Sequence, residues 1–232
     1  MKKIWKWLDN FWYHNKWKTI IIAFFVIVFI IGFVQCMKKT DADISILYVG
    51  PEVVTGEEYD AMETSLESRV DTDYNGDGKI TVQFTDRVYL SDAQLKEKED
   101  QAISEGEALF YDKSAMKSSL DQARQWILSG AMLIAVMDYE VYKTFESQKD
   151  KLFVRLDEYL DEVPAYAYDD YSLNLKDVPY VQFSGAFAAI SNDTVIVLIT
   201  PTWTSTLGKD EMAERYKVHE ELMQKIVNFS VE

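Results

Sequence analysis

Two apolar runs decide the fold of this chain: Ile44-Ser-Ile-Leu-Tyr-Val49 and Met132-Leu-Ile-Ala-Val-Met137. Each is almost continuous in apolar residues, which is typical of a strand buried on both faces in the centre of a parallel sheet. Gly50-Pro51 ends the first run, because proline cannot donate a hydrogen bond to a neighbouring strand. We therefore expect the two runs to lie side by side and parallel.

The residues between the two runs predict helices and one further strand. Apolar residues recur at helical spacing in two stretches, and Gly130 ends the second of them. These residues are Met62, Leu66 and Val70 in the first stretch, and Met116, Leu120, Ala123 and Ile127 in the second. Ser91 and Gln94 form a capping box that predicts the start of another helix. Alternation over Ile80–Phe84 predicts a half-exposed edge strand beside the first run.

The second half of the chain breaks this regular order. We expect short helices over 139–160, a loop over 165–178 and a closing helix over 210–229. Tyr180–Ile190 and Thr194–Ile199 flank Ser191-Asn-Asp193, a pattern that predicts an antiparallel hairpin. The fold class expected is α/β, with a mixed, mostly parallel sheet flanked by helices and this late hairpin.

The N-terminal part predicts a membrane anchor. Thr19–Met37 contains no charged residue and would rise about 28 Å as a helix, close to the ~30 Å hydrocarbon core of a bilayer. Five lysines precede it and two follow, which favours a cytoplasmic N-terminus. We therefore predict an uncleaved, single-pass signal anchor over 19–37, after a Trp- and Lys-rich juxtamembrane segment over 1–18. A stalk over 38–43 and an extracytoplasmic domain over 44–232 would follow.

Charge limits the partners of that domain. Removing the seven lysines and one aspartate of residues 1–39 from the chain totals of 24 basic and 39 acidic residues leaves 17 and 38, a net charge of −21. Nucleic acids need a basic surface, so we expect no nucleic-acid partner. The one cysteine, Cys36, lies outside the domain, so we expect no disulfide there. About 190 residues are enough to bury a core without one.

Part of the domain resembles a known family. Gln122–Gly130 followed by AMLIAVMDYEVYKTF resembles the helix–glycine–strand segment of extracytoplasmic solute-binding proteins of the periplasmic-binding-protein type 2 class. The segment AFAAIS at 186–191 and the helix at 211–229 also resemble the end of that family. The resemblance covers about two-thirds of the domain and implies one lobe of a protein that normally has two. The hinge and cleft between lobes are therefore not expected here.

One loop carries explicit metal chemistry. The stretch Asp71-Thr-Asp-Tyr-Asn-Gly-Asp-Gly-Lys-Ile80 looks like a calcium loop of the EF-hand and dockerin type. Side-chain oxygens alternate with spacers, and glycine permits the tight turn that points them at one centre. The best register begins at Asp73, with ligands from Asp73, Asn75, Asp77 and the Lys79 carbonyl. An alternative register begins at Asp71, and Asp71 is also a candidate extra ligand.

The loop departs from a full EF-hand at its twelfth position. The Asp73 register places Phe84 where the EF-hand has a bidentate glutamate. The missing ligand would come from Asp71, Glu67, Asp86 or water. A turn rich in Gly, Asn and Asp joins a helix to a strand without metal too, so that reading stays open. We expect weak calcium binding with a structural role.

Catalytic motifs are missing from the sequence. His219 is the only histidine of the domain, and its spacing places it on the apolar face of the last helix. Tyr166, Tyr168 and Tyr171 lie among acids in a loop that could contact sugars or a partner. We predict a non-enzymatic binding or assembly module with an unknown small-molecule ligand and an envelope protein partner, accessory to a transporter or secretion system. The alternative is a carboxylate-dependent, carbohydrate-active hydrolase.

Overall fold

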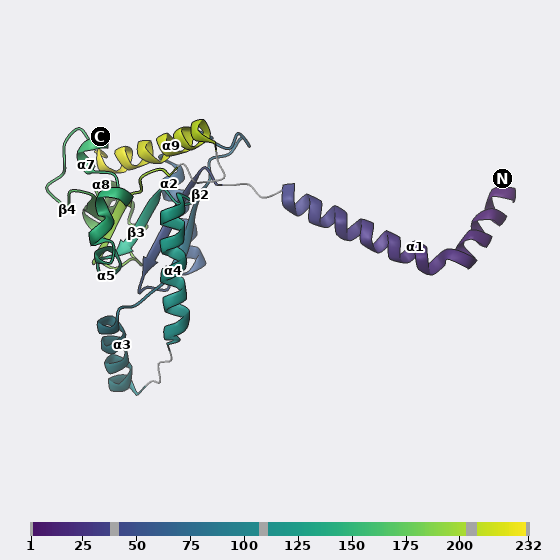
Figure 1. Ribbon diagram of the computed structural model, residues 1–232, viewed down its shortest axis with the longest axis horizontal. Coiled ribbons are helices and arrows are strands. Elements are labelled where there is room, and N and C mark those ends of the chain that lie inside the picture. The colour runs from purple at the N-terminus through teal and green to yellow at the C-terminus, as the bar shows by residue number, and fades with distance from the viewer. Residues whose placement is uncertain (1, 38–41, 107–110, 203–207, 231–232) are drawn as a thin grey trace. The chain divides into compact units, whose positions relative to one another are not determined.

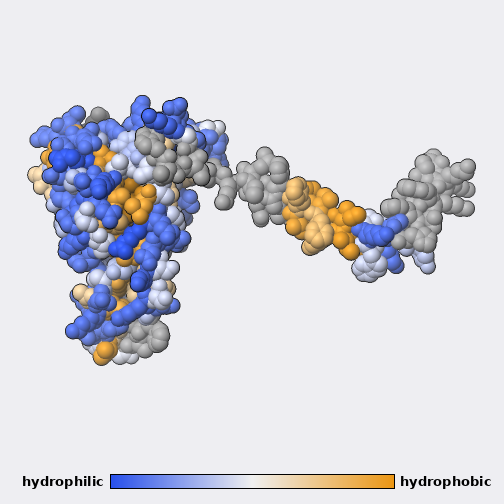
Figure 2. All heavy atoms as spheres, in the orientation of Figure 1, coloured by the Kyte–Doolittle hydropathy of each residue, from blue (hydrophilic) through white to orange (hydrophobic). Residues whose placement is uncertain are grey.

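The computed structural model describes residues 2–37, 42–106, 111–202 and 208–230 (Figure 1). In the first helix, α1 (Lys2–Met37), side chains are described for residues 12, 13 and 15–30. The chain divides into two compact units, Met1–Asp41 and Ala42–Glu232. On the face drawn in Figure 2, the second unit is largely hydrophilic, in keeping with its many acids.

The prediction of a single-pass transmembrane helix and signal anchor over residues 19–37 is wrong. That stretch is not a separate element, because α1 runs without a break from Lys2 to Met37. Among the described residues, no helix has both the length and the apolar character needed to cross a membrane.

The second unit is built on a six-stranded mixed sheet in the order β2-β1-β3-β6-β5-β4. The strands are β1 (Ile44–Gly50), β2 (Val82–Val88), β3 (Ile134–Asp138), β4 (Ala167–Asp169), β5 (Ser172–Asn174) and β6 (Thr194–Leu198). β1 lies between β2 and β3 and is parallel to both, which confirms the predicted centre of the sheet. The remaining three pairings are antiparallel, so the expectation of a mostly parallel sheet is wrong.

Helices cover both faces of this sheet. They are α2 (Gly56–Glu67), α3 (Asp92–Glu105), α4 (Lys113–Ser129), α5 (Tyr139–Lys143), α6 (Lys149–Leu152), α7 (Leu156–Tyr159), α8 (Pro179–Ser184) and α9 (Lys209–Val227), with 3-10 turns η1 (Glu146–Gln148) and η2 (Leu175–Asp177). α2, α8 and α9 pack on one face, while α4, α5 and α6 pack on the other. α3 and the first half of α4 lie beyond one end of the sheet (Figure 1).

The buried strands divide their side chains between two cores. In β1, Ile46 and Tyr48 join the core under α2 and α9, whereas Leu47 and Val49 join the core under α4. Because successive side chains of a strand point to opposite faces, an uninterrupted apolar run is what a strand covered on both sides requires. β2 is an edge strand whose burial alternates, as its sequence predicts.

The late hairpin is the main error in the predicted topology. Thr194–Leu198 is a strand, but the stretch before it contains the helix α8, which begins with Pro179 and ends at Gly185 with φ +65°. Proline suits the first turn of a helix and a left-handed glycine suits its end. The hairpin forms instead from β4 and β5, inside the region expected to be a loop, and β5 pairs with β6.

Candidate functional site

The 73–79 loop joins α2 to β2, and the side chains of Asp73, Asn75 and Asp77 turn inward to its own backbone. The two carboxylate oxygens of Asp73 accept hydrogen bonds from the amides of Gly76 (2.7 Å) and Gly78 (2.8 Å). Both glycines have positive φ, +71° and +84°, a conformation that other residues rarely adopt. The first carboxylate of the predicted ligand set is therefore fixed at the centre of the turn.

The next two predicted ligands follow the same pattern. Asn75 Oδ1 accepts a hydrogen bond from the amide of Asp77 at 2.9 Å, and Asp77 Oδ1 accepts one from the amide of Lys79 at 2.9 Å. The structure thus brings Asp73, Asn75, Asp77 and the backbone of Lys79 into one tight loop.

Asp71 does not join this loop. Its Oδ2 lies 2.6 Å from Nζ of Lys225 at the end of α9. Two other candidates for the missing ligand are also engaged or distant. Glu67 accepts a hydrogen bond from the amide of Val82 at 3.2 Å, and Asp86 pairs with Tyr48 in the β1–β2 register, near the opposite end of β2 from the loop. The register that begins at Asp73 is therefore the one the fold presents.

Asp43 is the residue that sequence reasoning missed. It lies just before β1, is fully buried, and its two oxygens accept hydrogen bonds from the amides of Asn75 (2.9 Å) and Thr81 (2.7 Å). One carboxylate thereby fastens both the middle and the end of the loop to the central strand. The only signal in the sequence is an acid directly before an almost continuous apolar run.

His219 has a structural role, as its position on an apolar helix face predicts. It is fully buried. Its Nε2 accepts a hydrogen bond from the amide of Ser45 at 3.3 Å, so Nδ1 carries the proton and donates to the carbonyl of Arg215 at 2.8 Å. Burial lowers the pKa of His219 to about 3. The imidazole therefore joins β1 to α9 in its neutral form.

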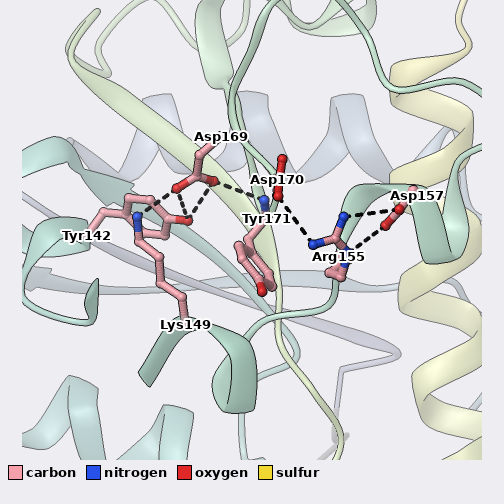
Figure 3. Close-up of polar contacts among 7 residues, drawn as sticks. All are labelled: Tyr142, Lys149, Arg155, Asp157, Asp169, Asp170 and Tyr171. Atoms are coloured by element: carbon pink, nitrogen blue, oxygen red, sulfur yellow. Dashed lines mark hydrogen bonds and ion pairs between the residues drawn. The ribbon is translucent and has the colours of Figure 1, made fainter. Parts of the chain in front are cut away.

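A second polar cluster fastens the segment that follows β3 (Figure 3). Asp169 accepts hydrogen bonds from the Tyr142 hydroxyl (2.9 Å), Lys149 Nζ (2.7 Å), the Ser172 hydroxyl (2.8 Å) and the Tyr171 amide (2.9 Å). Burial acts to raise the pKa of Asp169, but these hydrogen bonds outweigh it and lower the pKa. This carboxylate is fully engaged by the protein.

The neighbouring group of three charged residues in Figure 3 is more exposed. Arg155 lies between Asp157, which it reaches at 2.9 Å, and Asp170, which it reaches at 3.2 Å. Tyr168, one of the predicted contact tyrosines, stacks on Tyr139 with ring centroids 4.6 Å apart. The tyrosines of this region thus pack against the domain itself.

One buried carboxyl group lies at the carboxyl end of a central strand. Asp138 ends β3, and its oxygens accept hydrogen bonds from the amide of Glu140 (2.8 Å) and the side chain of Gln94 (2.9 Å). Burial raises the pKa of Asp138, although both hydrogen bonds act in the opposite direction. Ligands of α/β sheets commonly bind at such strand ends, but both oxygens of Asp138 are occupied by the protein.

Among the described residues, no group of three or more His, Cys, Asp or Glu side chains is arranged to hold a metal ion. The predicted calcium set contains two carboxylates, one amide oxygen and one carbonyl, so it is a sparser kind of site. Comparison of the chain with family models, curated proteins and solved structures finds no match. The resemblance to solute-binding proteins stays a prediction.

Proposed function

We propose that this chain is a non-enzymatic binding or assembly module whose 73–79 loop binds calcium in a structural role. The observation that carries the proposal is the inward arrangement of the loop oxygens. Asp73, Asn75 and Asp77 each accept a hydrogen bond from a loop amide two to five residues ahead. The same hydrogen bonds that fold the loop hold these oxygens together, which lowers the entropy cost of gathering them around a cation.

The donor set suits calcium better than the other common metals. Carboxylate, amide and carbonyl oxygens are hard ligands, and calcium accepts them in flexible geometry with water filling the remaining positions. Asp73, Asn75, Asp77 and the Lys79 carbonyl would hold the ion. Asp71 and Glu67 are engaged elsewhere, so water would complete its coordination. Few charged ligands imply a Kd on the order of 10⁻⁴ to 10⁻³ M, the range of extracellular modules.

Asp43 would act as a positioning residue. Its carboxylate binds the amides of Asn75 and Thr81, so it holds the loop against β1 without contacting the ion. A strand rather than a second helix follows the loop, so the loop cannot open as a sensory EF-hand pair does. Calcium would then stabilise the connection between α2 and β2.

The hydrolase alternative is less well supported. Glycoside hydrolysis needs two carboxyl groups that face one open site. The carboxyl groups with raised pKa, Glu63, Asp138 and Glu220, lie on α2, at the end of β3 and on α9. Each accepts a hydrogen bond from the protein, from Phe84, Glu140 and Gln224 in turn. These bonds give the three groups structural roles, so the non-enzymatic role is the better supported.

Thermal melting of the purified full chain tests the proposal. At about 10 mM calcium, binding to the folded state alone should add roughly 1–3 kcal/mol to the free energy of unfolding. Each kcal/mol should raise Tm by about 2–4 °C. Magnesium at the same concentration should have a smaller effect, because it demands octahedral geometry and gives up water reluctantly. Equal Tm values in EDTA, magnesium and calcium would reduce the loop to a metal-free turn.

A further inference from the structure

A surface groove of about 600 Å³ lies where the turn after α2, the helix α8 and the end of α9 meet. Its volume falls within the range of small-molecule sites. The lining combines positive charge with aromatic rings: Arg69, Phe183, Lys225 and Phe229 contribute, together with the amides of Gln224 and Asn228. In a unit with so many acids, this composition is unusual.

Arg69 is the central cation of the groove. Its guanidinium carbon lies 4.5 Å from the ring centroid of Tyr180 and 4.8 Å from that of Phe229, so the rings partly shield its charge from water. Among the described carboxylates, none lies within 4.0 Å of this guanidinium, and its buried Nε has no hydrogen-bond partner there. Because Nε is buried, an incoming anion would contact the terminal nitrogens of the guanidinium.

Aromatic surface lies next to that charge. Phe183 is 57% exposed, and its ring centroid is 4.8 Å from that of Phe229. Lys225 supplies a second positive charge beside the groove, although Asp71 partly neutralises it at 2.6 Å. A ligand with a carboxylate next to a flat apolar group would match both features, because arginine binds carboxylates bidentately and phenylalanine stacks on rings.

We propose that this groove binds a small aromatic carboxylate, with the carboxylate on Arg69 and the ring on Phe183 and Phe229. The proposal goes beyond the calcium loop and uses none of the predicted calcium ligands. Binding should therefore persist in EDTA. A site this open should bind a fragment of such size with a Kd on the order of millimolar.

Saturation-transfer NMR on the full chain in EDTA tests this proposal, with phenylacetate as the probe. Phenylacetate should bind, whereas acetate, which lacks the ring, and phenethylamine, which has the opposite charge, should bind at least several-fold more weakly. Arg69→Gln should weaken phenylacetate binding about ten-fold, the effect of losing one charge-assisted contact. Lys217→Gln, at an exposed position of α9 paired with Glu221, should leave it unchanged.

Phe183→Ser provides a second variant that does not depend on the folding of Arg69→Gln. Phe183 is exposed, so its replacement leaves the core intact, and it should weaken phenylacetate but not acetate. The proposal is overturned if phenethylamine binds as well as phenylacetate, if both groove variants bind phenylacetate like the unmodified chain, or if no transfer is detected at about 10 mM probe, well above the Kd expected.

Discussion

Asp43 Oδ1 accepts a hydrogen bond from the backbone amide of Asn75 at 2.9 Å, although the two residues lie 32 positions apart. The second oxygen of Asp43 binds the amide of Thr81 at 2.7 Å. A fully buried carboxylate thus serves as the shared acceptor for the loop that follows α2 and for the start of β2. This contact ties the candidate calcium loop to β1, which lies between β2 and β3 in the sheet.

Asp43→Asn should destabilise the domain by about 2 kcal/mol, because the new side chain amide turns a donor toward a backbone donor that then lacks an acceptor. Urea denaturation measures this change through the free energy of unfolding. Asp60→Asn, at an exposed position of α2, should change it by less than about 0.5 kcal/mol. Equal effects of the two substitutions would show that Asp43 does not fasten the loop.

His219 should make the stability of the domain depend on pH. Its pKa is lowered to about 3 by burial, so below the ordinary histidine pKa of about 6.5 only the unfolded state takes up the proton. Stability should therefore fall as pH decreases from about 6.5 toward 3, by up to about 1.4 kcal/mol per pH unit. Above pH 7 this contribution is complete.

His219→Gln isolates that effect. Glutamine does not titrate and retains an acceptor for Ser45 and a donor for Arg215. Urea denaturation at pH 7, 6 and 5 gives the free energy of unfolding of the unmodified chain and of this variant. The difference between them should shrink as the pH falls, because only the unmodified chain loses the contribution of the histidine. Parallel pH profiles for the two proteins would contradict a neutral, buried His219.

Asp169 and Asp170 offer a matched pair of neighbouring acids. Asp169→Asn should cost about 2 kcal/mol, because it removes a charge-assisted bond to Lys149, whose side chain is only 11% exposed. Asp170 is 69% exposed and meets Arg155 at the surface, so Asp170→Asn should cost less than about 0.5 kcal/mol. Limited proteolysis of the 139–178 segment gives a second measurement beside denaturation. Equal losses of stability and equal cleavage rates in the two variants would show that the cluster around Asp169 is not structural.

Gly130 should tolerate a side chain less well than Gly185. Both end a helix with positive φ, +68° and +65°, so alanine is strained at either position. An added Cβ at Gly130 would meet Thr202 Oγ1 at 2.5 Å, whereas nothing lies within 4 Å at Gly185. Gly130→Ala should therefore be more destabilising by about 1–3 kcal/mol. Thermal melting of the two variants gives the comparison, and equal Tm values would contradict it.

The sequence predicted the elements whose burial pattern is strong. Ile44–Val49 and Met132–Met137 read as central strands because both of their faces are apolar, and β1 and β3 lie side by side and parallel as expected. The capping box of Ser91 with Gln94 and the glycine that ends α4 are local signals, and both are confirmed. Local patterns suffice where one face or both faces of an element are uniformly buried.

Two parts of the chain needed more than a local pattern. Tyr180–Ile190 is rich in residues that favour strands, yet its start is a short helix that begins at Pro179 and ends before Gly185. The role of Asp43 depends on a contact across 32 positions, which no spacing within the loop reveals. The prediction for residues 19–37 rested on their apolar composition. It did not consider that they belong to one longer helix, α1.

Calcium titration of the purified full chain by isothermal titration calorimetry tests the central claim most directly. One saturable site should appear with a Kd on the order of 10⁻⁴ to 10⁻³ M, and the double variant Asp73→Asn, Asp77→Asn should abolish it. Asp71→Asn should retain it, because Asp71 pairs with Lys225 rather than with the loop. A titration without saturable heat up to about 10 mM calcium, or loss of the site in Asp71→Asn alone, would contradict the account.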